Sequence, residues 1–349
     1  ATPLTTGKTW GGTVQYDATT GAQTIVTGTY NNLTLSNTGG TDTAGSNLVV
    51  NGTLTTAAGG TLNMVTYDLS VANVTNSGTI RTQSLSATPL TTGKTWGGTV
   101  QYDAAGGQAI MVGTYNNLTL SGSGAKTFSV GTTTVNGILS MEGTATTTLT
   151  GTLTYGTNAT LQYNTLTART AGAEWITPFA ATGGVIIANT GKITLNAAKV
   201  FNASVPLTIQ SGATLDTGNF QLTFGGNFVN NGGTFTAGSS PIVIANTMVT
   251  QSIAGFTTTG LVSMTKTAGI ATLQGNVNGA GLTINGSGGT LNLGTGLTHA
   301  FTGVVTLTAG TLNGGSSTLS LTGNFTNNGG TFTSGTGTVT FNGTANNVT

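Results

Sequence analysis

Apolar and polar residues alternate with a period of two in short segments along the whole chain. Such a period places alternate side chains on opposite faces of a β-strand. NG, GG and SG pairs, which favour turns, separate the segments, and the abundant Thr, Gly, Asn and Val are poor helix formers. The pattern therefore predicts an all-β chain. The clearest segments are NLTLS (32–36), TLNMV (61–65), NLTLS (117–121), TLQYN (160–164), KITLN (192–196), GLTIN (281–285) and TLSLT (318–322).

The predicted strands recur at intervals of about 20 residues, as the comparable segments that begin at Leu118, Leu139 and Leu161 show. This spacing is typical of a solenoid in which each coil adds one rung to two or three parallel sheets. We therefore predict a parallel β-helix of roughly 16–18 coils. An antiparallel sandwich array or a β-propeller fits less well, because the internal repeats differ in length.

A long duplication shows how the chain is organised. The segment ATPLTTGKTWGGTVQYD occupies residues 1–17 and recurs without change at 87–103. A module copied next to itself must present ends that fit each other, which is the property of a stacked repeat protein. We predict one continuous rod with module 1 at 1–86, module 2 at 87–170, and a continuing solenoid at 171–349 that carries a second repeat type at 226–239 and 323–336.

Composition excludes several classes of protein. Charged residues make up 4% of the 349 residues and the net charge is +1, so no basic surface for nucleic acid is expected. The hydrophobic fraction of 36% is high enough for packing, unlike a disordered chain. No apolar run is long enough for a transmembrane helix, and the absence of Cys excludes disulfides and thiolate metal sites. We expect no membrane insertion.

The repeats resemble those of large bacterial cell-surface proteins. Segments such as GTYNNLTLSGSGAKTF (113–128), TVNGILSM (134–141), SGATLDTGNFQLTFGGNF (211–228) and GNFTNNGGTFTSGTGTVTFNG (323–343) are similar to adhesin-like, autotransporter-associated or filamentous-haemagglutinin-like β-strand repeats. The resemblance covers most of the chain and is weakest around 165–190. It implies a right-handed parallel β-helix displayed outside the cell, at a bacterial surface, with an adhesive, fibrous or matrix role.

Five aromatic residues are the candidate contacts for glycans or for neighbouring subunits. Trp10 and Trp96 occupy equivalent repeat positions, Tyr16 and Tyr102 follow six residues later, and Trp175 lies in an atypical segment. Exposed Trp and Tyr rings can stack on sugars or dock neighbouring rods. The competing interpretation, which we favour for the repeated tryptophans, is that they pack at a corner of the coil.

Catalytic and cofactor sites are not expected. LTTGKT at 4–9 and 90–95 lacks the first Gly of a phosphate-binding loop and leads into a strand. The seven carboxylates are scattered, whereas glycoside hydrolysis needs two across one bond. We expect Asp17 and Asp103 to serve turns or to pair with Lys8 and Lys94, and the single histidine, His299, to face solvent or to cap. No GGxGxD calcium repeat is present. We predict a protein that is not an enzyme and has no cofactor or metal.

Two further expectations concern surfaces. Thr-x-Thr pairs on successive coils are a known route to ice binding, but the pairs here are irregularly spaced along the sequence, which disfavours that function. The chain starts and stops inside repeat units and has low charge, so its end rungs are expected to accept another copy. The leading hypothesis is an extracellular fibre, stalk or matrix subunit that assembles head to tail. The alternatives are an adhesin for surface glycans or other matrix components and, less favoured, an ice-binding protein or a β-helix enzyme acting on polysaccharides.

Overall fold

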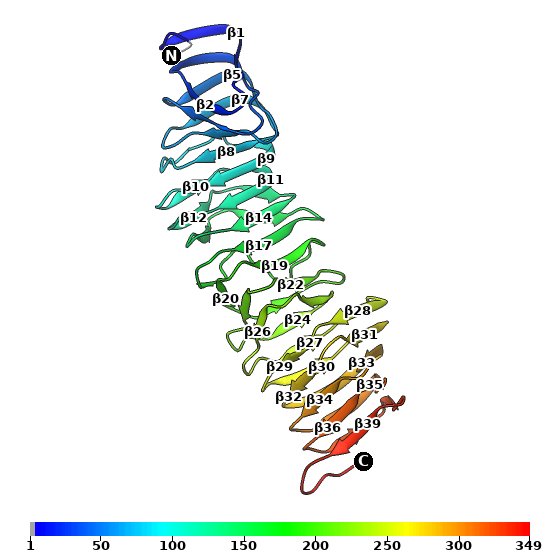
Figure 1. The fold of residues 1–349 in the computed structure, drawn as a ribbon. Coiled ribbons are helices and arrows are strands. Elements are labelled where there is room, and N and C mark those ends of the chain that lie inside the picture. The colour runs from blue at the N-terminus through cyan, green and yellow to red at the C-terminus, as the bar shows by residue number, and fades with distance from the viewer. Residues whose placement is uncertain (1–3) are drawn as a thin grey trace. The chain divides into compact units, whose positions relative to one another are not determined.

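The computed structural model describes residues 4–349, which are all β with parallel strands stacked as a β-solenoid of about 17 turns. These residues form two compact units, one comprising 4–165 with 172–174 and the other 166–171 with 175–349. Within each unit, strands that are one coil apart in the chain lie side by side as rungs (Figure 1). The predicted fold class and number of coils are confirmed. The first three residues of predicted module 1 lie outside the described residues.

The first unit contains seventeen strands, which are β1 (Lys8–Tyr16), β2 (Gly21–Ile25), β3 (Gly28–Leu35), β4 (Thr41–Ala44), β5 (Leu48–Thr56), β6 (Thr61–Asn63), β7 (Leu69–Asn76), β8 (Thr79–Thr82), β9 (Lys94–Tyr102), β10 (Gln108–Ile110), β11 (Gly113–Leu120), β12 (Ala125–Phe128), β13 (Thr132–Val135), β14 (Ile138–Met141), β15 (Thr146–Leu149), β16 (Thr152–Tyr155) and β17 (Thr160–Asn164).

The second unit contains β18 (Arg169–Thr170), β19 (Gly184–Ala188), β20 (Lys192–Thr194), β21 (Lys199–Val200), β22 (Leu207–Ile209), β23 (Thr214–Asp216), β24 (Leu222–Phe224), β25 (Phe228–Asn230), β26 (Thr234–Thr236), β27 (Ile242–Ile244), β28 (Thr250–Ile253), β29 (Phe256–Thr257), β30 (Leu261–Met264), β31 (Ile270–Leu273), β32 (Val277–Gly279), β33 (Gly281–Asn292), β34 (Thr298–Phe301), β35 (Val305–Asn313), β36 (Thr318–Leu321), β37 (Phe325–Asn327), β38 (Thr331–Thr333) and β39 (Thr338–Phe341).

The hydrophobic core is a set of columns that run from rung to rung. Leu118 lies opposite Leu139, and Leu139 lies opposite Leu161, so the segments that marked the repeat in the sequence stack in register. All three side chains are fully buried. The alternation of the sequence is therefore an alternation between this column and the surface, and a shift of one residue would expose the whole column.

Asparagine side chains hold successive coils together at the bends. The backbone N–H of Thr53 donates to Oδ1 of Asn32 at 2.9 Å, and the N–H of Ile138 donates to Oδ1 of Asn117 at 3.0 Å. The same contact recurs in the second unit, where the N–H of Ala300 donates to Asn278 at 2.9 Å. Bends interrupt the strand ladder and leave backbone donors that need partners, which explains why Asn is frequent where strands bend.

The atypical stretch between the repeats contributes to both units. In the first unit, Glu174 is fully buried and accepts hydrogen bonds from the hydroxyl of Tyr163 at 2.7 Å, from the N–H of Gly172 at 2.8 Å and from the hydroxyl of Thr147. In the second unit, Lys199 donates from Nζ to the carbonyl of Trp175 at 2.7 Å. The division at 165–175 lies near the expected boundary at 170/171, whereas the expected boundary at 86/87 lies inside the first unit. A single continuous rod stays a prediction.

Candidate functional site

Four of the five aromatic residues singled out from the sequence are core residues. Tyr16 is 1% exposed, Trp96 and Tyr102 are 0% exposed, and Trp175 is 2% exposed. Side chains with no exposed face cannot stack on a sugar or on a neighbouring rod, so their burial does not support the contact hypothesis for these four. These four rings are buried because they occupy inward-facing positions at the corners of the coil, where large side chains fit. Trp10 alone is half-buried, and its ring stacks on Tyr30 with centroids 4.6 Å apart.

The single histidine is buried, so the expectation that it faces solvent is wrong, and the expectation that it caps is confirmed. The backbone N–H of Val277 donates to Nδ1 of His299 at 3.0 Å, and Nε2 lies 2.8 Å from the carbonyl of Leu293. Burial lowers the pKa of His299, because the charged imidazolium is poorly solvated there. Within residues 4–349, no group of three His, Asp or Glu side chains could hold a metal ion.

The expected pairing of Asp103 with Lys94 does not form. Lys94 donates from Nζ to the carbonyl of Ala72 at 2.6 Å, while Asp103 forms an ion pair with Arg81. Arg81 lies on β8 directly opposite Gln101 of β9, two residues before Asp103. The coil length of about 20 residues places Arg81 one rung before Asp103, but the choice between Arg81 and Lys94 also depends on where the bend falls.

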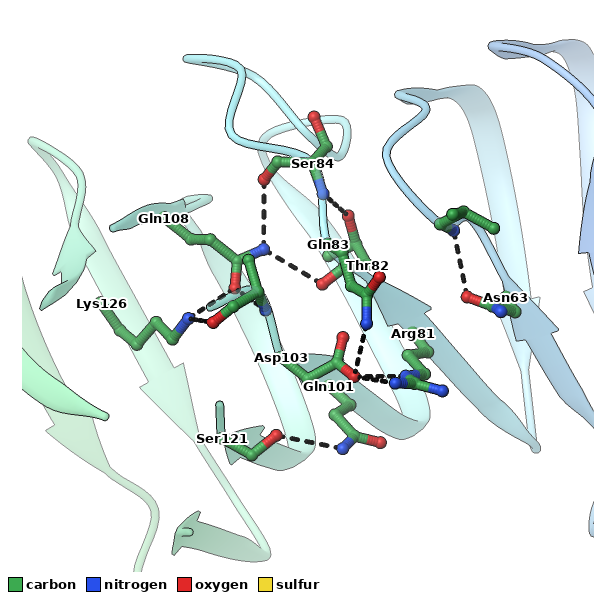
Figure 2. Close-up of polar contacts among 12 residues, drawn as sticks. Asn63, Arg81, Thr82, Gln83, Ser84, Gln101, Asp103, Gln108, Ser121 and Lys126 are labelled. Atoms are coloured by element: carbon green, nitrogen blue, oxygen red, sulfur yellow. Dashed lines mark hydrogen bonds and ion pairs between the residues drawn. The ribbon is translucent and has the colours of Figure 1, made fainter. Parts of the chain in front are cut away.

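A cluster of polar side chains surrounds this ion pair (Figure 2). Oδ2 of Asp103 accepts hydrogen bonds from Nε and Nη2 of Arg81 and, at 3.3 Å, from Nε2 of Gln83. The Asp103 side chain is 6% exposed and that of Arg81 is 39% exposed. We call Arg81, Gln83 and Asp103 the Asp103 corner. It presents a buried carboxylate and a half-exposed guanidinium at one bend of the solenoid.

A buried Gln–Lys pair supports the loops beside the Asp103 corner. Nε2 of Gln108 donates to the carbonyls of Thr82 at 3.0 Å and Ser84 at 3.1 Å. Nζ of Lys126 donates to Oε1 of Gln108 at 2.7 Å and to the carbonyl of Ala104 at 2.9 Å. Burial lowers the pKa of Lys126 to about 8, and the Asp103 carboxylate opposes this shift. The pair fixes the backbone at 82–84 and at 104. These segments include Gln83 and adjoin Arg81 and Asp103, the three residues of the Asp103 corner.

A hollow of about 740 Å³ opens next to the Asp103 corner. Its walls combine polar groups with the side chain of Leu85, which is 64% exposed. A concave site with an apolar wall and a few fixed polar groups is the usual form of a small-molecule site. The lining residues are Thr66, Gln83, Leu85, Asp103, Ala104, Ala105 and Gly106.

Threonines align between rungs more regularly than the sequence spacing indicated. Thr290, Thr311 and Thr331 lie in register on successive rungs of the second unit. The neighbouring column changes from Asn313 to Thr333, so a complete Thr-x-Thr pair does not continue along that face. Irregular spacing along the sequence is therefore compatible with one regular threonine column, but the second column of a Thr-x-Thr face is not all threonine.

Thr-x-Thr pairs do stack on two rungs of the first unit, where Thr132 and Thr134 face Thr152 and Thr154. The hydroxyls of Thr134 and Thr154 lie 2.9 Å apart and bond to each other. This contact stabilises the stack of rungs.

Among the described residues, no helix is long and apolar enough to cross a bilayer. Comparisons with protein-family models, with curated proteins and with solved structures find no match to this chain. The fold and the geometry of the Asp103 corner are therefore the observations that bear on function.

Proposed function

We propose that this chain is a structural protein of a bacterial surface, an extracellular β-solenoid that serves as a fibre, stalk or matrix subunit and assembles head to tail. The observation that carries the proposal is the identity in sequence of β1 and β9. Inside the first unit, β9 pairs on one side with β11 and on the other with β8. Strand β1 has the same nine residues and pairs with β3.

The identical segment supplies a template for what covers the edge of β1 that pairs with no described strand. The backbone N–H of Thr99 in β9 donates to the carbonyl of Gly78 in the preceding coil at 3.0 Å. Thr13 is the equivalent residue of β1. An edge with unpaired N–H and C=O groups and almost no charge is a site for adding another strand. A strand from the last coil of a second copy would satisfy it, and such a contact does not close, so it gives a filament.

Electron microscopy of the purified chain tests the proposal. We expect filaments whose number rises with protein concentration, and we expect Thr13→Pro to abolish them, since proline removes the edge donor. Thr13→Val keeps the N–H and is the matched control, which should still form filaments. Isolated particles at every concentration, or filaments unaffected by Thr13→Pro, would overturn head-to-tail assembly through β1.

A second candidate, glycan adhesion, is favoured by one specific observation, the hollow at the Asp103 corner. The aromatic residues predicted for that role do not support it, apart from Trp10, because they are buried. The polar groups of the hollow are a separate basis for sugar binding.

A further inference from the structure

We infer that a hollow on β1 is the docking site for β39 of a second copy, and that the two strands pair in the register that β8 and β9 show inside the first unit. The inference rests on the proposed head-to-tail assembly and names the strands that meet in it. It also assigns a contact to Gln23, whose side-chain amide donates to the docked strand.

The hollow lies along the second half of β1 and has a volume of about 300 Å³. It is lined by Leu4, by residues 13–17 and by Gln23. In the duplicated segment the equivalent stretch is covered, because β8 pairs with residues 99–102 of β9. Among the described strands, β1 pairs with β3 alone. The hollow is therefore the place that a strand like β8 would occupy.

Gln23 has a side-chain amide without an acceptor. Gln23 and Gln108 are equivalent, since Oε1 of each accepts from the backbone N–H of the residue after the repeated aspartate, at 3.0 Å and 2.9 Å. Nε2 of Gln108 donates to two carbonyls at the end of β8, at 3.0 Å and 3.1 Å. Nε2 of Gln23 donates to no residue in the described part of the chain. The amide therefore offers an incoming strand the same contact that Gln108 gives to β8.

Strand β39 matches β8 in sequence pattern and in its place in the coil. Read from the preceding glycine, β8 is GTIRT and β39 is GTVTF. After each of these strands the chain returns to the strand that began the coil, where Leu90 bridges Leu69 and Val348 bridges Phe325. Among the described strands, β39 pairs with β36 alone. It is therefore the strand of a second copy that reproduces β8.

Docking would cover inward side chains that are incompletely buried on both strands. Val14 of β1 is half-buried, whereas its equivalent Val100 is 0% exposed. On β39, Phe341 is 41% exposed, whereas Leu321, directly opposite on β36, is 0% exposed. In the register of β8 and β9, Phe341 would lie opposite Tyr16. Removal of these apolar surfaces from water favours the contact.

The charges allow the two surfaces to meet. Residues 267–349 of the sequence contain no Asp, Glu, Lys or Arg. In the internal pair of strands, Arg81 of β8 meets the carboxylate of Asp103. Thr340 stands in the place of Arg81 on β39, and its hydroxyl can donate to Asp17 at the end of β1. The docked strand therefore brings no like charges together and leaves the repeated carboxylate with a donor.

The register of β8 and β9 determines the expected contacts. Arg81 lies directly opposite Gln101 in the internal pair. Thr340 of the second copy would therefore lie opposite Gln15, with both side chains pointing outward. The amide of Gln23 would donate to the two carbonyls at the end of β39.

Disulfide cross-linking tests the register, because the chain contains no Cys. Directly opposite residues of neighbouring strands lie about 4.8 Å apart, within the Cα separation of about 4.4–6.8 Å that a disulfide spans. We expect the full chain with Gln15→Cys and Thr340→Cys to form disulfide-linked multimers under mild oxidation. Ser320 lies opposite Thr340 one rung farther on, about 9.6 Å from Gln15, so Ser320→Cys should not replace Thr340→Cys. Arg81→Cys with Gln101→Cys is the positive control and should close within one copy.

Gln23→Met tests the amide separately, since it removes the donors and keeps the length of the side chain. Two hydrogen bonds of ordinary strength change an equilibrium constant about tenfold or more, so the protein concentration needed for filaments should rise by that factor. Gln162→Met, on β17, is the matched control and should change that concentration less than about twofold. Thermal unfolding shows whether each variant keeps its fold, and cross-linking decides the inference if Gln23→Met does not.

Two results would overturn the inference and leave head-to-tail assembly standing. One is filaments in which Gln15→Cys with Thr340→Cys cross-links no more than Gln15→Cys with Ser320→Cys. The other is a folded Gln23→Met variant that assembles at the same concentration as Gln162→Met. Absence of filaments from the parent chain at every concentration would instead overturn the proposed function, and this inference with it.

Discussion

The two copies of KTWGGTVQY share every residue but not their surroundings. Among the described strands β1 pairs with β3 alone, whereas β9 lies between β8 and β11. Trp10 is half-buried and Trp96 is 0% exposed, and the middle of β1 is largely exposed where β9 is largely buried. The difference shows that the coil before it contributes to the burial of a coil in this solenoid.

The hydrogen bonds of one tyrosine pair are the same in both copies. The hydroxyls of Tyr16 and Tyr30 lie 3.4 Å apart, and those of Tyr102 and Tyr115 lie 3.2 Å apart. In both copies the second tyrosine also donates to a backbone carbonyl four residues earlier. Burial of the pair raises the pKa of Tyr102 to about 12. The local sequence therefore determines this chain of hydrogen bonds whether or not a preceding coil is present.

One buried position carries opposite charges in the two copies. Asp42 and Lys126 are both fully buried and lie on equivalent strands, β4 and β12. Asp42 accepts from the N–H of Gln23 at 3.2 Å and from the side chain of Asn37. Lys126 instead donates to carbonyls and to Gln108. The position shared by Asp42 and Lys126 accommodates either charge, because hydrogen-bond donors and acceptors of the backbone are both within reach there.

The largest expected effect on stability concerns the two equivalent tryptophans, whose surroundings differ between the copies. Trp96→Ala leaves a cavity between two rungs and should cost about 3–5 kcal/mol of unfolding free energy. Trp10→Ala should cost less than half as much, since its ring is partly solvated already. Urea denaturation, followed by hydrogen exchange to locate the loosened coils, measures both. Equal losses would show that the preceding coil contributes little to burial at this position.

A smaller effect concerns Lys126 and the dependence of stability on pH. The pKa of Lys126 is lowered to about 8 in the folded chain, from 10.5. Between these values the unfolded chain binds more protons than the folded chain, so the unfolding free energy should rise as the pH increases from about 8 to about 10. Thermal unfolding across that range measures the rise.

Lys126→Met should reduce this rise, and Asp42→Asn, at the equivalent position, should leave it intact because it removes no amine. Burial also lowers the pKa of Lys266, so a residual rise is expected in Lys126→Met. If the unfolding free energy of the parent chain falls steadily from about pH 8 to about pH 10, the predicted effect of the buried Lys126 amine is wrong.

The sequence predicted the fold because the solenoid repeats one simple rule. Alternation and a period of about 20 residues were enough to align Leu118 with Leu139 and Leu161. The side chains at the corners could not be assigned in the same way. Whether Trp96 faces inward and whether Asp103 meets Arg81 or Lys94 depends on where the bends fall in each coil, and the loop at 83–93 alters that locally.

The smallest expected effect on stability concerns an asparagine position at which the two copies should behave alike. Asn32 and Asn117 each accept a backbone N–H from the following coil, at 2.9 Å and 3.0 Å. That coil is present in both copies, since β3 pairs with β5 and β11 pairs with β14. Asn32→Ala and Asn117→Ala should therefore each cost about 1 kcal/mol, the usual value of one such hydrogen bond. Urea denaturation of the two variants side by side measures the costs, and a clear difference between them would mean that the preceding coil also influences this bend.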